Sequence, residues 1–102
     1  MLNSRQRQFL KARAHALKPV MHVGKGGVTP AQAAELDVMV DSLELVKVKV
    51  NPNSFEDEDT AARALCAAVA GLEHVWTIGH TMLFFRPSRT HDTRFPLGAG
   101  TE

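Results

Sequence analysis

The sequence contains no tyrosine, one tryptophan and one cysteine among 102 residues. The lone Cys66 cannot form a disulfide within the chain, and a domain of this length folds without one, which fits a reducing compartment. The small number of aromatic residues argues against binding nucleic acid by extensive base stacking. No apolar run approaches the roughly 20 residues of a membrane span, and no apolar signal core follows the charged N-terminus. We therefore expect one cytoplasmic domain with no membrane contact.

The net charge is also small. Twelve Lys and Arg residues oppose eleven Asp and Glu residues, which leaves a formal net charge of +1. Taken alone, this total argues against a nucleic-acid binder that relies on bulk positive charge. Position along the chain changes that inference, because residues 1–27 hold no acid and the acids begin at Glu35. The basic residues of this N-terminal part, which we predict to form one pole of the domain, are Arg5, Arg7, Lys11, Arg13, Lys18 and Lys25.

Two helices are predicted in the first half of the chain. Residues 4–17 are rich in helix formers, place apolar residues at helical spacing and begin with Ser4 as a candidate N-cap. A second helix has Thr29 as its N-cap and Pro30 at its first position, and its apolar spacing extends to Leu43.

A third helix is predicted after the turn cluster that precedes Ser54. Ser54 and Asp57 resemble a capping box, and Gly71 is expected to end the helix. Four acids at residues 56–59 crowd its first turn, where the helix dipole favours negative charge. Helix capping therefore explains this acidic cluster without a catalytic role.

Four segments have the pattern of strands. Residues 20–23 form a short apolar run, and residues 45–50 alternate between valine and lysine from Val46 onward. Residues 73–78 and 81–86 are expected to form a hairpin through the turn at Gly79-His80. The order α-β-α-β-α-β-β predicts a small α/β domain of the α+β, two-layer kind, with a four-stranded mixed sheet and helices packed on a face of it.

The domain is expected to span residues 1–87. The segment 88–102 contains Pro96, Gly98 and Gly100, and we predict that it forms a flexible C-terminal tail.

The loop Gly24-Lys25-Gly26-Gly27 is the most informative motif. Its glycines permit positive φ and close approach of main-chain N–H groups to a ligand, while the lysine and the following helix N-terminus favour an anion such as phosphate. The spacing fits neither a Walker A loop nor a dinucleotide site, and is closer to the GXXG loop of the KH module, which clamps a nucleic-acid backbone. A simple turn between strand and helix is the alternative reading.

Further cations could support such a site. Arg7, Lys11 and Lys18 are spaced to lie within roughly 40° on one helix face. Lys47 and Lys49 alternate with buried valines, so they belong to the open face of a strand. An ordinary solvated surface is again the alternative.

The adjacent Phe84 and Phe85 must point to opposite faces of the sheet. Like Trp76, they fall in the last two strands, where aromatic residues most often fill the core or a sheet face. Core packing is the favoured reading, but one of the two phenylalanine rings could be exposed and stack on a base.

No catalytic or metal site is legible. The five histidines show no pair at metal-ligand spacing, and no Ser, His and Asp arrangement is recognisable. We predict a protein that is not an enzyme and has no metal, cofactor or small-molecule substrate.

Several segments carry a family resemblance across most of residues 2–87. They are Leu2-Asn3-Ser4-Arg5-Gln6-Arg7-Gln8-Phe9-Leu10-Lys11, Ala14-His15-Ala16-Leu17-Lys18-Pro19-Val20, Val23-Gly24-Lys25-Gly26-Gly27-Val28-Thr29-Pro30 and Glu44-Leu45-Val46-Lys47-Val48-Lys49-Val50. In this order they resemble the bacterial YhbY proteins, stand-alone forms of the CRM domain (chloroplast RNA splicing and ribosome maturation).

The resemblance implies an RNA-binding domain with a fold similar to the C-terminal domain of translation initiation factor three. It also implies association with large-subunit rRNA or precursors of the large ribosomal subunit. In that family the glycine loop and the basic surface beside it are taken to contact RNA. The positions onto which this role carries over are Gly24, Lys25, Gly26, Gly27, Arg5, Arg7, Lys11, Lys18, Lys47 and Lys49.

This sequence departs from the family pattern near the last hairpin. Gly79-His80 stands where Gly-Arg is expected, and Phe85 stands where tyrosine is common. A histidine is mostly neutral near pH 7, so an RNA contact made by that arginine in relatives would be weaker here.

The leading hypothesis is therefore a non-enzymatic RNA-binding protein of large-subunit assembly. The alternative is an adaptor that joins a ribonucleoprotein assembly through its acidic helices and touches RNA incidentally. A nucleotide-binding enzyme is a third possibility, but no metal ligand or general base accompanies the loop.

Overall fold

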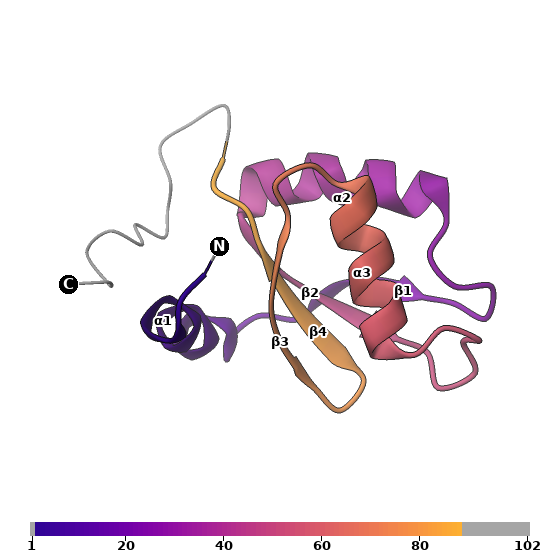
Figure 1. Ribbon diagram of the computed structural model, residues 1–102, viewed down its shortest axis with the longest axis horizontal. Helices are drawn as coiled ribbons and strands as arrows, with labels where there is room; N and C mark the ends of the chain where they lie inside the picture. Colours follow the sequence, from indigo (N-terminus) through magenta and orange to yellow (C-terminus); the bar gives the residue numbers. More distant parts are fainter. Residues whose placement is uncertain (1, 89–102) are drawn as a thin grey trace.

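A computed structural model describes residues 2–88 of the protein, and the predicted order of helices and strands is confirmed (Figure 1). None of the helices in this part of the chain is long and apolar enough to cross a membrane. Apart from Ser88, the predicted tail lies outside the described residues. The elements are α1 (Ser4–Ala14), β1 (Pro19–Val23), α2 (Pro30–Leu43), β2 (Leu45–Val50), α3 (Glu58–Ala68), β3 (Glu73–Ile78) and β4 (Thr81–Phe85).

The four strands form one mixed sheet in the order β1-β2-β4-β3. β1 and β2 are parallel and are connected by α2, whereas β4 is antiparallel to both of its neighbours. The alternation of β2 sends its valines to the face covered by α2 and α3, as predicted, and they enter the larger core. The buried residues of this core are Met21, Val23, Ala33, Leu36, Val40, Val46, Val48, Val50, Ala61, Ala62, Leu65, Val69, Leu72, Met82 and Phe84.

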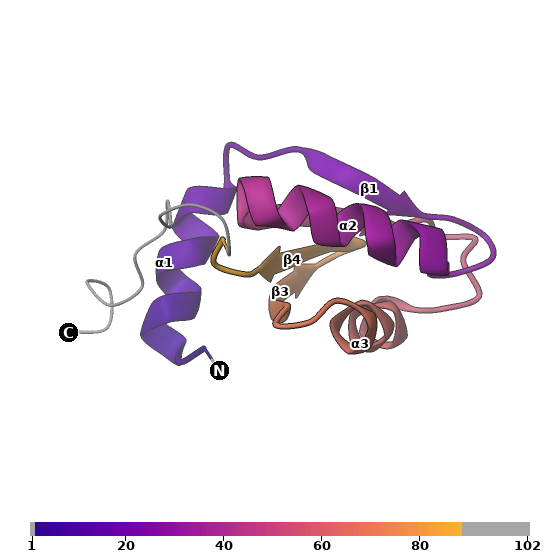
Figure 2. The same cartoon turned by 90° about the horizontal axis from the view of Figure 1, so that it is seen from above.

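Helix α1 packs on the face of the sheet opposite α2 and α3, and it covers only one end of that face (Figures 1 and 2). Leu10 and Ala14 form a smaller core there with Phe85 and other sheet residues. Phe84 and Phe85 are consequently both buried, 0% and 1% exposed, one in each core. Core packing, the favoured reading of these two rings, is therefore confirmed, and the alternative of a ring free to stack on a base is ruled out.

Two helix starts differ from the prediction because a neighbouring residue provides the cap. Asn3, not Ser4, caps α1, since its side chain accepts a hydrogen bond from the Gln6 amide at 2.8 Å. Asp57, not Ser54, caps α3, and it accepts from the Thr60 amide at 2.8 Å. The second helix starts as predicted, with Thr29 as N-cap and Pro30 at the first position.

The ends of α1 and α3 also come earlier than expected. α1 ends at Ala14 rather than near Leu17, and a turn follows in which the Leu17 amide donates to Ala14 O at 3.0 Å. α3 ends at Ala68, before Gly71. Lys18 therefore lies outside the helix on which its spacing was counted.

An ionic network around the buried Arg86 fastens the end of β4 to α2. Arg86 is 3% exposed and its guanidinium is paired with the carboxylates of Asp37 and Asp41. Glu44, which ends α2 with a φ of 66°, is fully buried and accepts a hydrogen bond from the Ser88 amide at 2.6 Å. β4 consequently stops at Phe85, one residue before the predicted end.

Candidate nucleic-acid interface

The glycine loop forms a tight turn between β1 and α2. Gly27 donates its amide to Gly24 O at 3.0 Å, and it is the only residue of the loop with positive φ, at 79°. Lys25 and Gly26 occupy the exposed tip, and among residues 2–88 their amides find no acceptor. The tip is therefore the part of the loop that offers main-chain donors to an outside ligand.

A carboxylate of the protein itself occupies the other side of the loop. Glu56 Oε1 accepts a hydrogen bond from the Val28 amide at 2.7 Å, just before α2 begins. A Cβ added to Gly27 would lie 2.4 Å from that same oxygen, whereas a Cβ on Gly24 or Gly26 would meet nothing within 4 Å. Within this loop, glycine is thus required by the fold at position 27 alone. The anion position predicted at the start of α2 is taken by Glu56, which leaves the tip for a ligand.

The segment 51–56 lies beside the glycine loop and adds an aromatic side chain to it. Asn51 donates its amide to Val23 O at 2.9 Å, and Phe55 donates its amide to Lys25 O at 3.3 Å. The Phe55 side chain is 76% exposed. Sequence reasoning missed this residue, although an isolated aromatic in a polar turn before an acidic helix start was a visible signal.

Two cations predicted on α1 face β3 instead of open solvent. Arg7 Nη1 donates to His74 O at 2.8 Å and to Val75 O at 2.6 Å. Lys11 Nζ lies 4.2 Å from the centre of the Trp76 ring, within cation–π range. With Lys18 outside the helix, the predicted stripe of three cations does not form. Arg5 is exposed on the first turn of α1.

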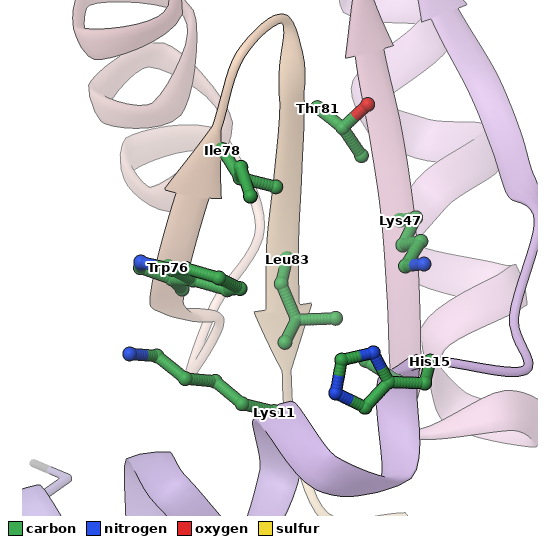
Figure 3. A pocket seen from close by; sticks show the side chains of 8 residues that line it. Lys11, His15, Lys47, Trp76, Ile78, Thr81 and Leu83 are labelled. Carbon is green, nitrogen blue, oxygen red and sulfur yellow. The ribbon is translucent and has the colours of Figure 1, made fainter.

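The part of the sheet that α1 leaves uncovered carries the two predicted lysines of β2. Lys49 is exposed and pairs in register with His22 of β1. Lys47 is half-buried, and its Nζ donates to Leu17 O at 3.0 Å. A pocket of about 130 Å³ opens on this face (Figure 3). Its lining residues are Lys11, Ala14, His15, Lys47, Trp76, Ile78, Thr81 and Leu83.

The acidic residues near α3 are used within the fold. The Thr60 hydrogen bonds hold the pKa of Asp57 below its ordinary value, as expected of a helix cap. Glu58 accepts from His80 Nδ1 at 3.0 Å, and this bond lowers the pKa of Glu58. His80, which stands where the family resemblance calls for arginine, is therefore tied to the start of α3.

Residues with the potential for covalent or metal chemistry are scattered in the part of the chain that the structure describes. No three His, Cys, Asp or Glu side chains within residues 2–88 are grouped so that they could hold a metal ion. Cys66 is half-buried on α3, and burial raises the pKa of its thiol, which disfavours the reactive thiolate.

Comparison with known proteins places the chain in a family. The CRS1/YhbY (CRM) domain matches residues 2–86. "Probable RNA-binding protein YqeI" of Bacillus subtilis is 36% identical over 89 residues, which cover 87% of this chain and 92% of that protein. A protein of Haemophilus influenzae named "RNA-binding protein" is 35% identical over 95 residues, covering 93% of this chain and 95% of the relative.

A solved structure agrees with these sequence relatives. The solution structure of the hypothetical protein SAV1595 from Staphylococcus aureus superposes with a TM-score of 0.75 at 31% identity, covering 94% of this chain and 100% of that one. The element order, the sheet and the matched residues all point the same way. The chain belongs to the CRS1/YhbY (CRM) domain family.

Proposed function

We propose that this protein binds ribosomal RNA, catalyses no reaction, and acts in the assembly of the large ribosomal subunit. The names of its relatives support RNA as the ligand. The resemblance to YhbY proteins supports the large ribosomal subunit as the particle on which the protein acts. Its bacterial relatives support cytoplasmic action, because ribosomes are assembled in the cytoplasm of bacteria.

The observation that carries the proposal is the open tip of the glycine loop. The amides of Lys25 and Gly26 are available there, and the Lys25 side chain is exposed. Because glycine at 24 and 26 is not needed for packing, close approach of a ligand to the backbone is a physical reason for its presence. A phosphate oxygen would accept from the tip amides while Lys25 neutralises its charge.

The other predicted cations divide into two groups in this proposal. Lys18 and Lys49 are exposed and would add further phosphate contacts, while Arg5 would contribute charge from the first turn of α1. Arg7 and Lys47 make hydrogen bonds to main-chain carbonyls, and Lys11 lies over the Trp76 ring. These three would shape the surface and contribute charge from fixed positions. Binding through phosphates is sequence-independent and steeply salt-dependent, so RNA shape would dominate the selectivity.

An adaptor acting through acidic helices has less support. Asp57 caps α3, Glu58 bonds His80, and Glu56 satisfies the Val28 amide. The acids that such an adaptor would present to a partner are thus largely engaged within this protein.

The loop assignment is tested by Lys25→Ala, with Arg63→Ala as the control. Both side chains are exposed cations, but Arg63 lies on α3 and pairs with Asp59. Affinity for structured rRNA fragments should be measured over a range of salt concentrations. Lys25→Ala is expected to weaken binding and to reduce the salt slope by about 0.7–0.9, the value of one lost phosphate contact, while Arg63→Ala changes neither. An unchanged slope in Lys25→Ala would remove the loop from the binding site.

The role in assembly needs a separate experiment. Crosslinking in cells, read at nucleotide resolution, is expected to place the protein on large-subunit rRNA. Co-sedimentation with precursor particles should be lost when Lys18, Lys25 and Lys49 are neutralised together. Retention of the neutralised protein on the particles would favour the adaptor instead.

A further inference from the structure

We infer that the pocket beside Trp76 binds a single unpaired base of RNA. The inference rests on the proposed function and adds a second contact, distant in sequence from the glycine loop. Side chains from α1, β2, β3 and β4 come together to form this pocket (Figure 3).

An irregularity in β3 gives Trp76 its exposure. The register pairs His74 with Phe84 and Trp76 with Leu83, so Val75 is the extra residue of a bulge. Val75 is buried in the smaller core beneath α1, whereas Trp76 remains 37% exposed. The bulge therefore places the indole beside α1 and not under it. In this position a ligand can reach the indole.

The pocket combines apolar surface with positive charge. Leu83 lies between Trp76 on one side and His15 and Lys47 on the other (Figure 3). Lys11 Nζ stands over the indole at 4.2 Å from its centre, and none of the lining residues is acidic. A ligand that matches this lining has a flat apolar ring and carries negative charge close by. A base within an RNA strand has both properties.

Size restricts the ligand further. Pockets for drug-sized ligands and cofactors run from about 300 to 1,000 Å³, whereas this one measures about 130 Å³. It suits one planar ring whose attached chain stays on the surface.

The charge beyond the pocket suits that attached chain. Lys49 follows Lys47 on the same face of β2, and His22 lies opposite it on β1. In Figure 1, β1 and β2 run from the α1 end of the sheet toward the loop that precedes α2. A strand with one base in the pocket would thus lay its phosphates along these cations in the direction of the glycine loop.

The same face is poorly suited to a protein partner. Specific protein interfaces bury roughly 1,200 Å² or more in total. Among residues 2–88, Trp76 and Ile78 are the only large exposed apolar side chains that this face offers, since the others belong to α2 and to the turn before α3. RNA is the occupant that the small apolar area and the surrounding cations favour.

Tryptophan fluorescence provides a local test, because Trp76 is the only tryptophan and the chain has no tyrosine. The probes are a hairpin RNA with an unpaired loop and a fully paired duplex of the same stem. The hairpin is expected to quench the fluorescence at saturation, and the duplex is expected to leave it unchanged.

Substitutions extend the test. Trp76→Ala is expected to weaken hairpin binding about 5- to 150-fold, the range for one stacked base, without changing duplex binding. Val38→Ala, which trims a side chain 71% exposed on α2, is the matched control and should bind like the unaltered protein. Ile78→Glu keeps the tryptophan and puts an acid at the pocket rim, so hairpin quenching should be lost even if Trp76→Ala does not fold.

The outcomes separate this inference from the proposed function. Hairpin binding without quenching, together with full affinity in Ile78→Glu and in any folded Trp76→Ala, would overturn the pocket assignment and leave the loop proposal intact. Absence of binding to either RNA would overturn the proposed function and the pocket with it. Quenching by an acidic, leucine-containing peptide but by neither RNA would show a protein-binding surface and overturn the inference.

Discussion

The glycine loop and the Trp76 pocket offer RNA two different kinds of surface. The loop presents main-chain amides at the tip of a turn made by four consecutive residues. The pocket presents side chains from four elements, which meet only when the sheet and α1 have formed. A local motif can thus mark one contact on a binding surface, while the topology alone determines the other.

The two regions also differ in the charge that already occupies them. At the loop, Glu56 takes the position in front of the Val28 amide that an anion would otherwise use. At the pocket, Lys11 and Lys47 contribute cations and the lining has no acid. A phosphate approaching the loop therefore meets a competing carboxylate, and the pocket adds attraction without that competition.

The largest effect is expected from Gly27→Ala, which would break the loop. A residue with a Cβ in left-handed backbone costs roughly 1–2 kcal/mol. The new Cβ would also displace the Glu56 carboxylate from the Val28 amide, at a further cost of about 1 kcal/mol. The free energy of unfolding, measured by urea denaturation, should fall by about 2–3 kcal/mol.

Gly26→Ala is the matched control at the tip of the same loop. Its φ is not positive and its Cβ would meet nothing, so stability should change by less than about 1 kcal/mol. In a Glu56→Ala background there is no carboxylate to displace, so Gly27→Ala should cost only the backbone part, roughly 1–2 kcal/mol. Equal losses of unfolding free energy in Gly26→Ala and Gly27→Ala would show that Gly27 is not the structural position of the loop and Gly26 not part of an open tip.

A smaller effect is expected from Glu56→Gln, which removes the acid that distinguishes the loop from the pocket and so tests this difference in charge. Glutamine can still accept from the Val28 amide, but the negative charge beside the loop is gone. A like charge at contact distance costs about 1 kcal/mol in water, which is the upper limit here because Glu56 lies on the other side of the loop from the tip. RNA affinity at low salt should therefore rise by up to about fivefold, as measured by filter binding or anisotropy. Glu35→Gln, an exposed acid on α2, is the charge-matched control and should leave affinity nearly unchanged. No gain in Glu56→Gln would argue against phosphate binding at the loop.

The elements that sequence reasoning located depend on short-range signals. Thr29 with Pro30 fixes the start of α2, and the alternation in residues 45–50 fixes the faces of β2. The helix caps were missed by one and three residues, because Asn3 and Ser4, or Ser54 and Asp57, are equally good caps when only the sequence is known.

The features that were missed depend on distant parts of the chain. Glu56 reaches the loop across 28 residues, and Arg86 reaches Asp37 across 49. Trp76 is exposed because a bulge in β3 places it beside α1 and because α1 covers only one end of that sheet face, and no local pattern indicates either. The sequence therefore indicated the loop and the lysines of the candidate site, but not that Lys11 and Lys47 meet Trp76 in one pocket.

The smallest effect is a pH dependence of stability that sharpens the description of the pocket side of the sheet. His74 lies next to the bulge, with Nε2 at 2.6 Å from Thr77 Oγ1, and burial together with the nearby Arg7 charge holds its pKa below its ordinary value of 6.5. As the pH falls, the unfolded chain therefore binds a proton at His74 at a higher pH than the folded protein does. The stability contributed by the neutral His74 is full above pH 6.5 and declines as the pH falls below that value. The pKa values of Asp57 and Glu58 are also lowered, but the stability that these carboxylates contribute is lost only as the pH falls below their ordinary pKa values of 3.8 and 4.5. Urea denaturation followed by Trp76 fluorescence at pH 7 and pH 5 should show this loss, and His74→Gln should abolish it. An equal loss in His74→Gln would assign the pH dependence to another group.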